Sequence, residues 1–72
     1  MNREDITIIE SLEEAEYILS SFKKSSLKEI VMDVSNMEAN NINYLISMIE
    51  NNNLSFDIIR FNNFVFLKVK KP

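Results

Sequence analysis

The sequence predicts an α/β fold, a two-layer sandwich with the element order β-α-β-α-β-β. Two helices pack on one face of a mixed four-stranded sheet, and the sheet ends in a C-terminal antiparallel hairpin. Short runs rich in Ile, Val and Phe alternate with two stretches whose apolar residues recur at helical spacing. The last two runs are separated by two asparagines, which is the spacing of a hairpin. Because the chain has 72 residues, we expect a single domain, 1–72.

The first strand and the first helix are predicted at the N-terminal end. Residues 6–9 (Ile-Thr-Ile-Ile) form the strand. Ser11 and Glu14 have the spacing of a capping box, so the Ser11 hydroxyl accepts from the Glu14 amide and the Glu14 carboxylate returns to Ser11. Acids in the first turn and two lysines in the last suit the helix dipole. The apolar arc of this helix comprises Leu12, Ala15, Ile18, Leu19 and Phe22.

The second strand and the second helix occupy the middle of the chain. Residues 30–34 (Ile-Val-Met-Asp-Val) are almost continuously apolar, which predicts a strand buried on both faces. Ser35 or Asn36 caps a helix at about 38–50. Its core-facing arc is Ile42, Leu45, Ile46 and Ile49. The turns are expected at clustered asparagines, because Asn tolerates positive φ and the chain has no glycine.

The last two strands, 54–61 and 64–70, are joined by a two-residue loop, Asn62-Asn63, that sets their register. The expected pairs are Phe61 with Phe64, Arg60 with Val65, Ile59 with Phe66, Ile58 with Leu67, and Asp57 with Lys68. The face toward the helices carries Leu54, Phe56, Ile58, Val65, Leu67 and Val69. The opposite face carries Ser55, Asp57, Ile59, Phe61, Phe64, Phe66, Lys68 and Lys70. Helical crossovers predict that the first three strands run parallel as neighbours.

Composition excludes most catalytic machinery. The chain has no Cys, His or Gly, which excludes thiol and imidazole chemistry, zinc clusters and glycine-rich phosphate loops. Asp33 and Asp57 are carboxylates that nothing in the sequence brings together in a pocket. We therefore expect a non-enzymatic protein without a metal or cofactor. The sequence contains neither a membrane-spanning apolar run nor a secretion signal, so a cytoplasmic protein is expected.

The predicted opposite face of the hairpin carries the clearest functional signal. Ile59, Phe61, Phe64 and Phe66 form a contiguous apolar patch bordered by Asp57 and Lys68. Two helices cover only one face of a four-stranded sheet, so the patch has no cover within the fold, which is typical of a binding surface. The sequence predicts partner binding through Phe66, Phe64, Phe61 and Lys68. In the alternative interpretation the register slips by one residue, or a loop covers the patch, and these rings belong to the core.

A second surface is predicted on the second helix. Tyr44 and Met48 are four residues apart and lie away from its core-facing arc. A domain of this size buries only about 60% of its unfolded surface, so a second subunit is expected to add stability. The residues expected at the interface of a homodimer are Tyr44, Met48 and Ile59. In the alternative interpretation, Tyr44 and Met48 only widen the core stripe.

Several stretches resemble the core domain of the SepF cell-division family, over about residues 5–70. Residues 5–10 (Asp-Ile-Thr-Ile-Ile-Glu), followed by Ser-Leu-Glu-Glu-Ala, resemble the opening strand and acidic helix of that family. Residues 30–34 correspond to its Val-rich strand. Residues 57–67 (Asp-Ile-Ile-Arg-Phe-Asn-Asn-Phe-Val-Phe-Leu) resemble its Asp-Ile-x-x-Ile-Gly-x-x-Ile-Phe-Leu stretch. Asn51 and Asn62 fall at or near positions where the family has glycine.

The resemblance implies a role in septum formation. SepF proteins bind the C-terminal tail of the tubulin-like division protein FtsZ, dimerise, assemble further and tether FtsZ filaments to the membrane. Phe66 corresponds to the Phe of the family's Ile-Phe-Leu stretch, a position associated with partner binding. The family's N-terminal membrane helix has no counterpart in this sequence, so no direct membrane contact by this chain is expected.

Two other interpretations remain open. Residues 33–35 (Asp-Val-Ser) before a helix resemble a STAS regulatory domain, in which Ser35 would be the regulated hydroxyl, although the Asp-Ser-x-Gly turn of that family is missing. Aromatic residues on an open sheet beside Lys68, Lys70 and Lys71 are also compatible with single-stranded RNA binding. A net charge of −3 argues against nucleic acid as a partner, because it provides little attraction for phosphates.

Overall fold

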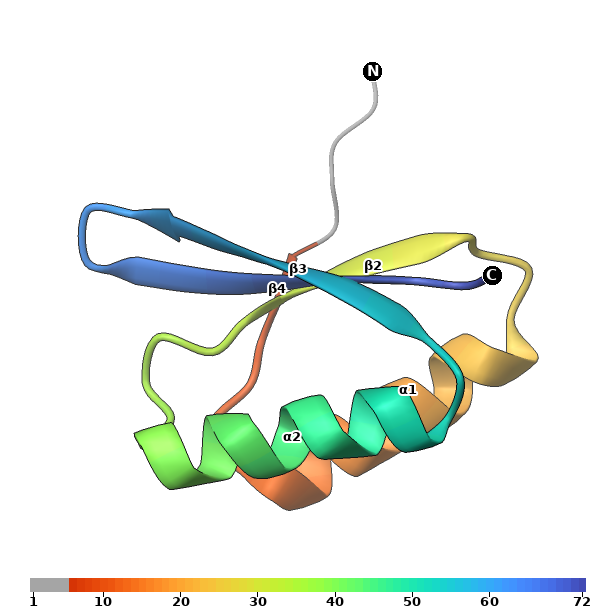
Figure 1. The fold of residues 1–72 in the computed structure, drawn as a ribbon, viewed down its shortest axis with the longest axis horizontal. Coiled ribbons are helices and arrows are strands. Elements are labelled where there is room, and N and C mark those ends of the chain that lie inside the picture. The colour runs from red at the N-terminus through yellow and green to blue at the C-terminus, as the bar shows by residue number, and fades with distance from the viewer. Residues whose placement is uncertain (1–5) are drawn as a thin grey trace.

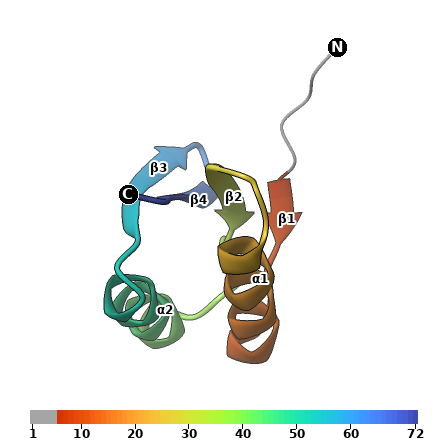
Figure 2. The ribbon, with the colours of Figure 1, turned by 90° about the vertical axis from the view of Figure 1, so that its right-hand side faces the viewer.

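A computed structural model describes residues 6–72 of the chain (Figure 1). The elements are β1 (Ile6–Ile8), α1 (Leu12–Lys24), β2 (Glu29–Asp33), α2 (Ala39–Asn51), β3 (Ser55–Phe61) and β4 (Phe64–Lys70). The two helices lie side by side on one face of a four-stranded mixed sheet, as Figure 2 shows from the side. The predicted fold class and element order are confirmed. Asp5, where the SepF-like sequence begins, lies outside the described residues.

The strand order is β1-β2-β4-β3, and this differs in part from the sequence prediction. β1 and β2 are parallel neighbours joined through α1, as predicted. The expectation that β3 lies beside β2 is wrong, because β4 inserts between them and is antiparallel to both. Burial explains the order: Leu67 and Val69 of β4 are fully buried, whereas β3 carries exposed charges that suit an edge strand.

The hairpin register is the predicted one. All five expected pairs are formed, from Phe61 opposite Phe64 to Asp57 opposite Lys68, and pairing continues to Ser55 opposite Lys70. Asn62, the first loop residue, has a φ of 56°, and Asn53, before β3, has a φ of 61°. Asparagine is the non-glycine residue that accepts this conformation most readily, so these two turns form without glycine.

Both helices begin at a capping residue, and each cap differs in detail from the prediction. The Ser11 hydroxyl accepts from the Glu14 amide at 3.2 Å, as expected. The Glu14 carboxylate accepts from the amide of Glu10, at 2.8 Å, and not from that of Ser11. The α2 cap is Glu38, which makes no side-chain cap hydrogen bond, so the prediction of Ser35 or Asn36 is wrong. The Ser35 side chain is instead bonded to β2 and β4.

The core lies between the sheet and the helices. Its buried apolar residues are Ile9, Ala15, Leu19, Phe22, Met32, Val34, Met37, Leu45, Ile49, Leu54, Leu67 and Val69. The prediction that β2 is buried on both faces is wrong. Met32 and Val34 are fully buried, but Val31 and Asp33 alternate to the other face, where they are only half-buried. Among residues 6–72, both helices lie on the Met32 side, and no other element covers the Val31 side.

Candidate interaction surface

The four apolar residues predicted to face away from the helices do so. We call the sheet side opposite α1 and α2 the outer face. Ile59, Phe61 and Phe64 are 42%, 63% and 47% exposed on it, and Phe66 is half-buried. On β4 the exposure alternates, because Leu67 and Val69, which point toward the helices, are fully buried, whereas on the edge strand β3 the helix-facing Ile58 is 41% exposed. The alternative register, in which these rings are core residues, is wrong.

Cross-strand contacts hold this patch together. Phe61 lies opposite Phe64 and Ile59 lies opposite Phe66 in the hairpin ladder. The rings of Phe64 and Phe66 stack along β4, with centroids 5.9 Å apart and an angle of 15° between their planes. Such pairs orient one another's rings. The hairpin therefore presents a preformed apolar surface on a hydrogen-bonded scaffold.

The outer face also carries apolar side chains on β1, which sequence reasoning did not place there, and the charged Asp33 and Lys68 stand between them and the hairpin patch. Ile8 lies opposite Asp33, Asp33 opposite Phe66, and Phe66 opposite Ile59, so one row crosses all four strands. Ile6 and Ile8 are 49% and 58% exposed, and Val31 between them and β4 is half-buried. The alternating Ile-Thr-Ile pattern of β1 was visible in the sequence. Whether Ile6 and Ile8 lie on the same side of the sheet as the hairpin patch depends on how β2 pairs with β4, and no local sequence pattern specifies that pairing.

The lysines beside the patch are in ion pairs. Lys68 lies 3.7 Å from the Glu29 carboxylate and Lys70 lies 3.2 Å from that of Asp57. Asp57 is opposite Lys68 in the ladder, as predicted, yet its ion pair is with the diagonal neighbour Lys70. These groups are partly exposed, so each pair contributes at most about 1 kcal/mol. Their main effect is to balance the positive charge beside the aromatic rings, which reduces attraction for phosphate groups.

Asp33 and Ser35 form a hydrogen-bonded network where β2 ends. The Ser35 hydroxyl donates to the Asp33 carboxylate at 2.6 Å and accepts from the amide of Val65 at 2.8 Å. The Ser35 amide donates to the same carboxylate oxygen at 3.0 Å. This half-buried hydroxyl therefore joins two strands, and a phosphate on it would remove the bond that it donates to Asp33 and place negative charge beside that carboxylate. The regulated-serine role that the STAS-like interpretation gives Ser35 conflicts with this structural role.

Asp33 and Asp57, the two carboxylates considered in the sequence analysis, lie on different strands and have different neighbours. In the ladder Asp33 is opposite Phe66, whereas Asp57 is opposite Lys68 and paired with Lys70. Within residues 6–72, no three side chains of the types that ligate metals come close enough together to hold an ion.

The three residues predicted for a dimer interface do not share a surface. Tyr44 is 61% exposed on α2, and Met48, one turn later, is half-buried and packs against the core. Ile59 lies on the outer face of the sheet, on the other side of the molecule from the helices. One two-fold contact cannot include all three, so Ile59 belongs with the hairpin patch.

The chain matches no model of a known protein family, no curated protein and no solved structure in the comparisons made with them. The similarity to SepF therefore rests on the short stretches of sequence alone. In the part of the chain that the structure describes, neither helix has the length and apolar character needed to span a membrane.

Proposed function

We propose that this protein is a non-enzymatic interaction and assembly module that binds another polypeptide through the outer face. One observation carries the proposal: Ile59, Phe61, Phe64 and Phe66 form an apolar surface that no element of residues 6–72 covers, on a sheet whose other face holds the core. Covering exposed apolar side chains contributes on the order of 1 kcal/mol each. The ladder fixes the backbone beneath the rings, so binding requires little ordering.

We propose the C-terminal tail of FtsZ as the partner, following the resemblance to SepF. Phe66, the residue carried over from that family, lies between Asp33 and Ile59 in the row that crosses the sheet from Ile8. The resemblance and the exposed apolar surface thus support the same residue independently. On this proposal the protein acts in the cytoplasm at the division site.

Titration of a fluorescently labelled FtsZ tail peptide tests this function by anisotropy. We expect Phe66→Ser and Phe61→Ser each to weaken binding at least tenfold, because central aromatic anchors carry most of the energy of an interface. Leu27→Ser is the matched control, since Leu27 is 55% exposed in the loop before β2, away from the patch. Circular dichroism verifies that each variant is folded. Equal affinity of all four proteins, or no binding by the wild type, contradicts the proposal.

A labelled oligouridine titrated in parallel separates this function from RNA binding. Because Lys68 and Lys70 are paired with carboxylates, we expect no oligouridine binding and only a modest effect of salt on the tail peptide. Oligouridine binding that falls steeply with salt concentration would instead support the RNA interpretation.

We also propose that the protein forms a homodimer through the exposed side of α2, leaving the outer face free. Tyr44 is the one aromatic residue of α2, and it is 61% exposed. By sedimentation velocity we expect a wild-type dimer at micromolar concentration and a monomeric Tyr44→Lys variant, because a buried unpaired lysine is costly. Phe64→Lys is the matched control, as it places the same charge on the outer face and keeps the dimer. A wild-type monomer, or dissociation by Phe64→Lys alone, contradicts this arrangement.

A further inference from the structure

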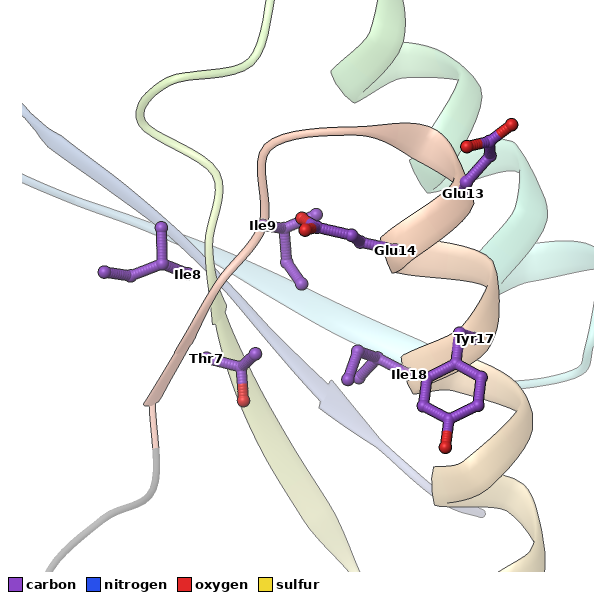
Figure 3. Close-up of a pocket in the computed structure, with 7 residues that line it drawn as sticks. All are labelled: Thr7, Ile8, Ile9, Glu13, Glu14, Tyr17 and Ile18. Carbon is purple, nitrogen blue, oxygen red and sulfur yellow. The ribbon is translucent and has the colours of Figure 1, made fainter.

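A second candidate binding site, separate from the proposed partner surface on the hairpin, lies between β1 and α1. It is a groove of about 400 Å³, lined by residues 7–9 and by Glu13, Glu14, Tyr17 and Ile18. In Figure 3, Thr7 and Ile18 face one another across it, the Glu14 carboxylate points toward the strand beside Ile9, and the Glu13 carboxylate points away from the strand. This volume is at the lower end of the range for ligand sites.

The strand side of the groove has unpaired backbone groups. β1 is an edge strand whose one neighbour in the described sheet is β2. The amide of Ile9 donates to the carbonyl of Asp33 at 2.9 Å, and Ile8 is the ladder partner of Asp33. In a parallel ladder of this register, Thr7 and Ile9 bond to β2, so the N–H and C=O of Ile8 point to the free edge. The amide of Glu10, the next outward donor, is already bonded to Glu14.

The helix side of the groove combines an apolar wall with negative charge. Tyr17 is 71% exposed and Ile18 is half-buried, so both present apolar surface to water. An aliphatic chain that lies along them removes its own apolar surface and theirs from water, which favours binding. Glu13 and Glu14 are both exposed and both line the groove, so the helix side carries negative charge. Among residues 6–72, no lysine or arginine lines the groove. A lysine side chain fits this arrangement, with its stem on the wall and its ammonium group beside the carboxylates.

We infer that this groove binds an extended basic segment of another polypeptide, which adds a strand to the free edge of β1. Side chains alternate along such a strand. Those facing the helix are lysines that reach Glu13 and Glu14, and those facing the other way are apolar and continue the outer face beside Ile8. Backbone hydrogen bonds to Ile8 supply affinity, and the acidic helix side of the groove supplies the preference for positive charge.

The probe is a short acetylated and amidated peptide that alternates lysine with valine, and a glutamate–valine peptide of the same length is its counterpart. In ¹⁵N-resolved spectra of the full chain, we expect the lysine peptide to shift the amide signals of Ile8 and Tyr17. At saturation, hydrogen exchange of the Ile8 amide slows at least tenfold. Binding of neither peptide at millimolar concentration, or equal binding of both, overturns the inference.

Two pairs of variants locate the site. Glu13→Lys is expected to lower the affinity for the lysine peptide at least fivefold. Glu16→Lys makes the same charge change on the same helix but outside the groove, and it is expected to change that affinity less than twofold. Ile8→Pro removes the amide that points to the edge and abolishes binding, whereas Ile8→Val keeps that amide and preserves binding. Equal effects within either pair contradict the inference. Glu13 and Glu16 lie on α1, on the other side of the sheet from the outer face, so binding of the FtsZ tail is a separate readout for this pair of variants.

Discussion

Replacing Leu67 by alanine is expected to lower the free energy of unfolding by about 2–5 kcal/mol, which is a large part of the stability of so small a domain. Leu67 is fully buried on the central strand β4, opposite Met32 on one side and Ile58 on the other. Its truncation leaves a cavity between the sheet and the helices that the surrounding ladder cannot close. Urea denaturation followed by circular dichroism measures the loss.

The neighbouring Phe66→Ala variant is the internal control. Phe66 is larger than Leu67, but it lies half-exposed on the outer face. Its truncation is expected to cost no more than about 1.5 kcal/mol, because only part of its surface is withdrawn from water. If Phe66→Ala proved the more destabilising variant, the assignment of the two faces of β4 would be wrong.

Replacing Ser35 by alanine is expected to lower the free energy of unfolding by about 1–3 kcal/mol. The change removes the hydroxyl that accepts from the Val65 amide at 2.8 Å and donates to the Asp33 carboxylate at 2.6 Å. The Val65 amide and the Asp33 carboxylate each lose a hydrogen-bond partner in a half-buried position. A polar group left there without a partner lowers the free energy of unfolding by more than the net contribution of a hydrogen bond. Thermal and urea denaturation measure the change.

Ser47→Ala is the matched control, since Ser47 is exposed on α2 and alanine favours a helix. Its effect is expected to stay within about 0.5 kcal/mol. If Ser35→Ala were equally neutral, the hydroxyl would have no structural role, and the STAS-like interpretation of Ser35 as a regulated residue would gain support.

Local signals predicted the elements that depend on local chemistry. The spacing of Ser11 and Glu14 predicted the start of α1, and the Asn62-Asn63 loop predicted the register of the hairpin. The predicted range of α2, about 38–50, is close to the observed Ala39–Asn51, but its capping residue was missed, because Ser35 has the type of a capping residue and is bonded across the sheet instead. Its partner, Val65, is distant in sequence, so no local pattern reveals this contact.

The order of the strands is the main feature that the sequence did not predict. The crossover rule correctly placed β1 beside β2, but the choice between β3 and β4 as the next neighbour depends on burial across the whole sheet. The same unknown strand order limited the prediction of the outer face. The Asn62-Asn63 loop and the alternation of side chains along the two hairpin strands placed Phe61, Phe64, Phe66 and Ile59 on that face. Ile8 could not be placed there, because its side of the sheet depends on how β2 pairs with β4.

The most direct test of the account is a titration of the isotope-labelled protein with the FtsZ tail peptide, followed through ring and methyl signals. We predict shifts concentrated on Phe61, Phe64, Phe66 and Ile59, with the signals of Leu67 little affected. Shifts restricted to the two helices, or unchanged spectra at excess peptide, would contradict the proposal that the outer face is the binding surface.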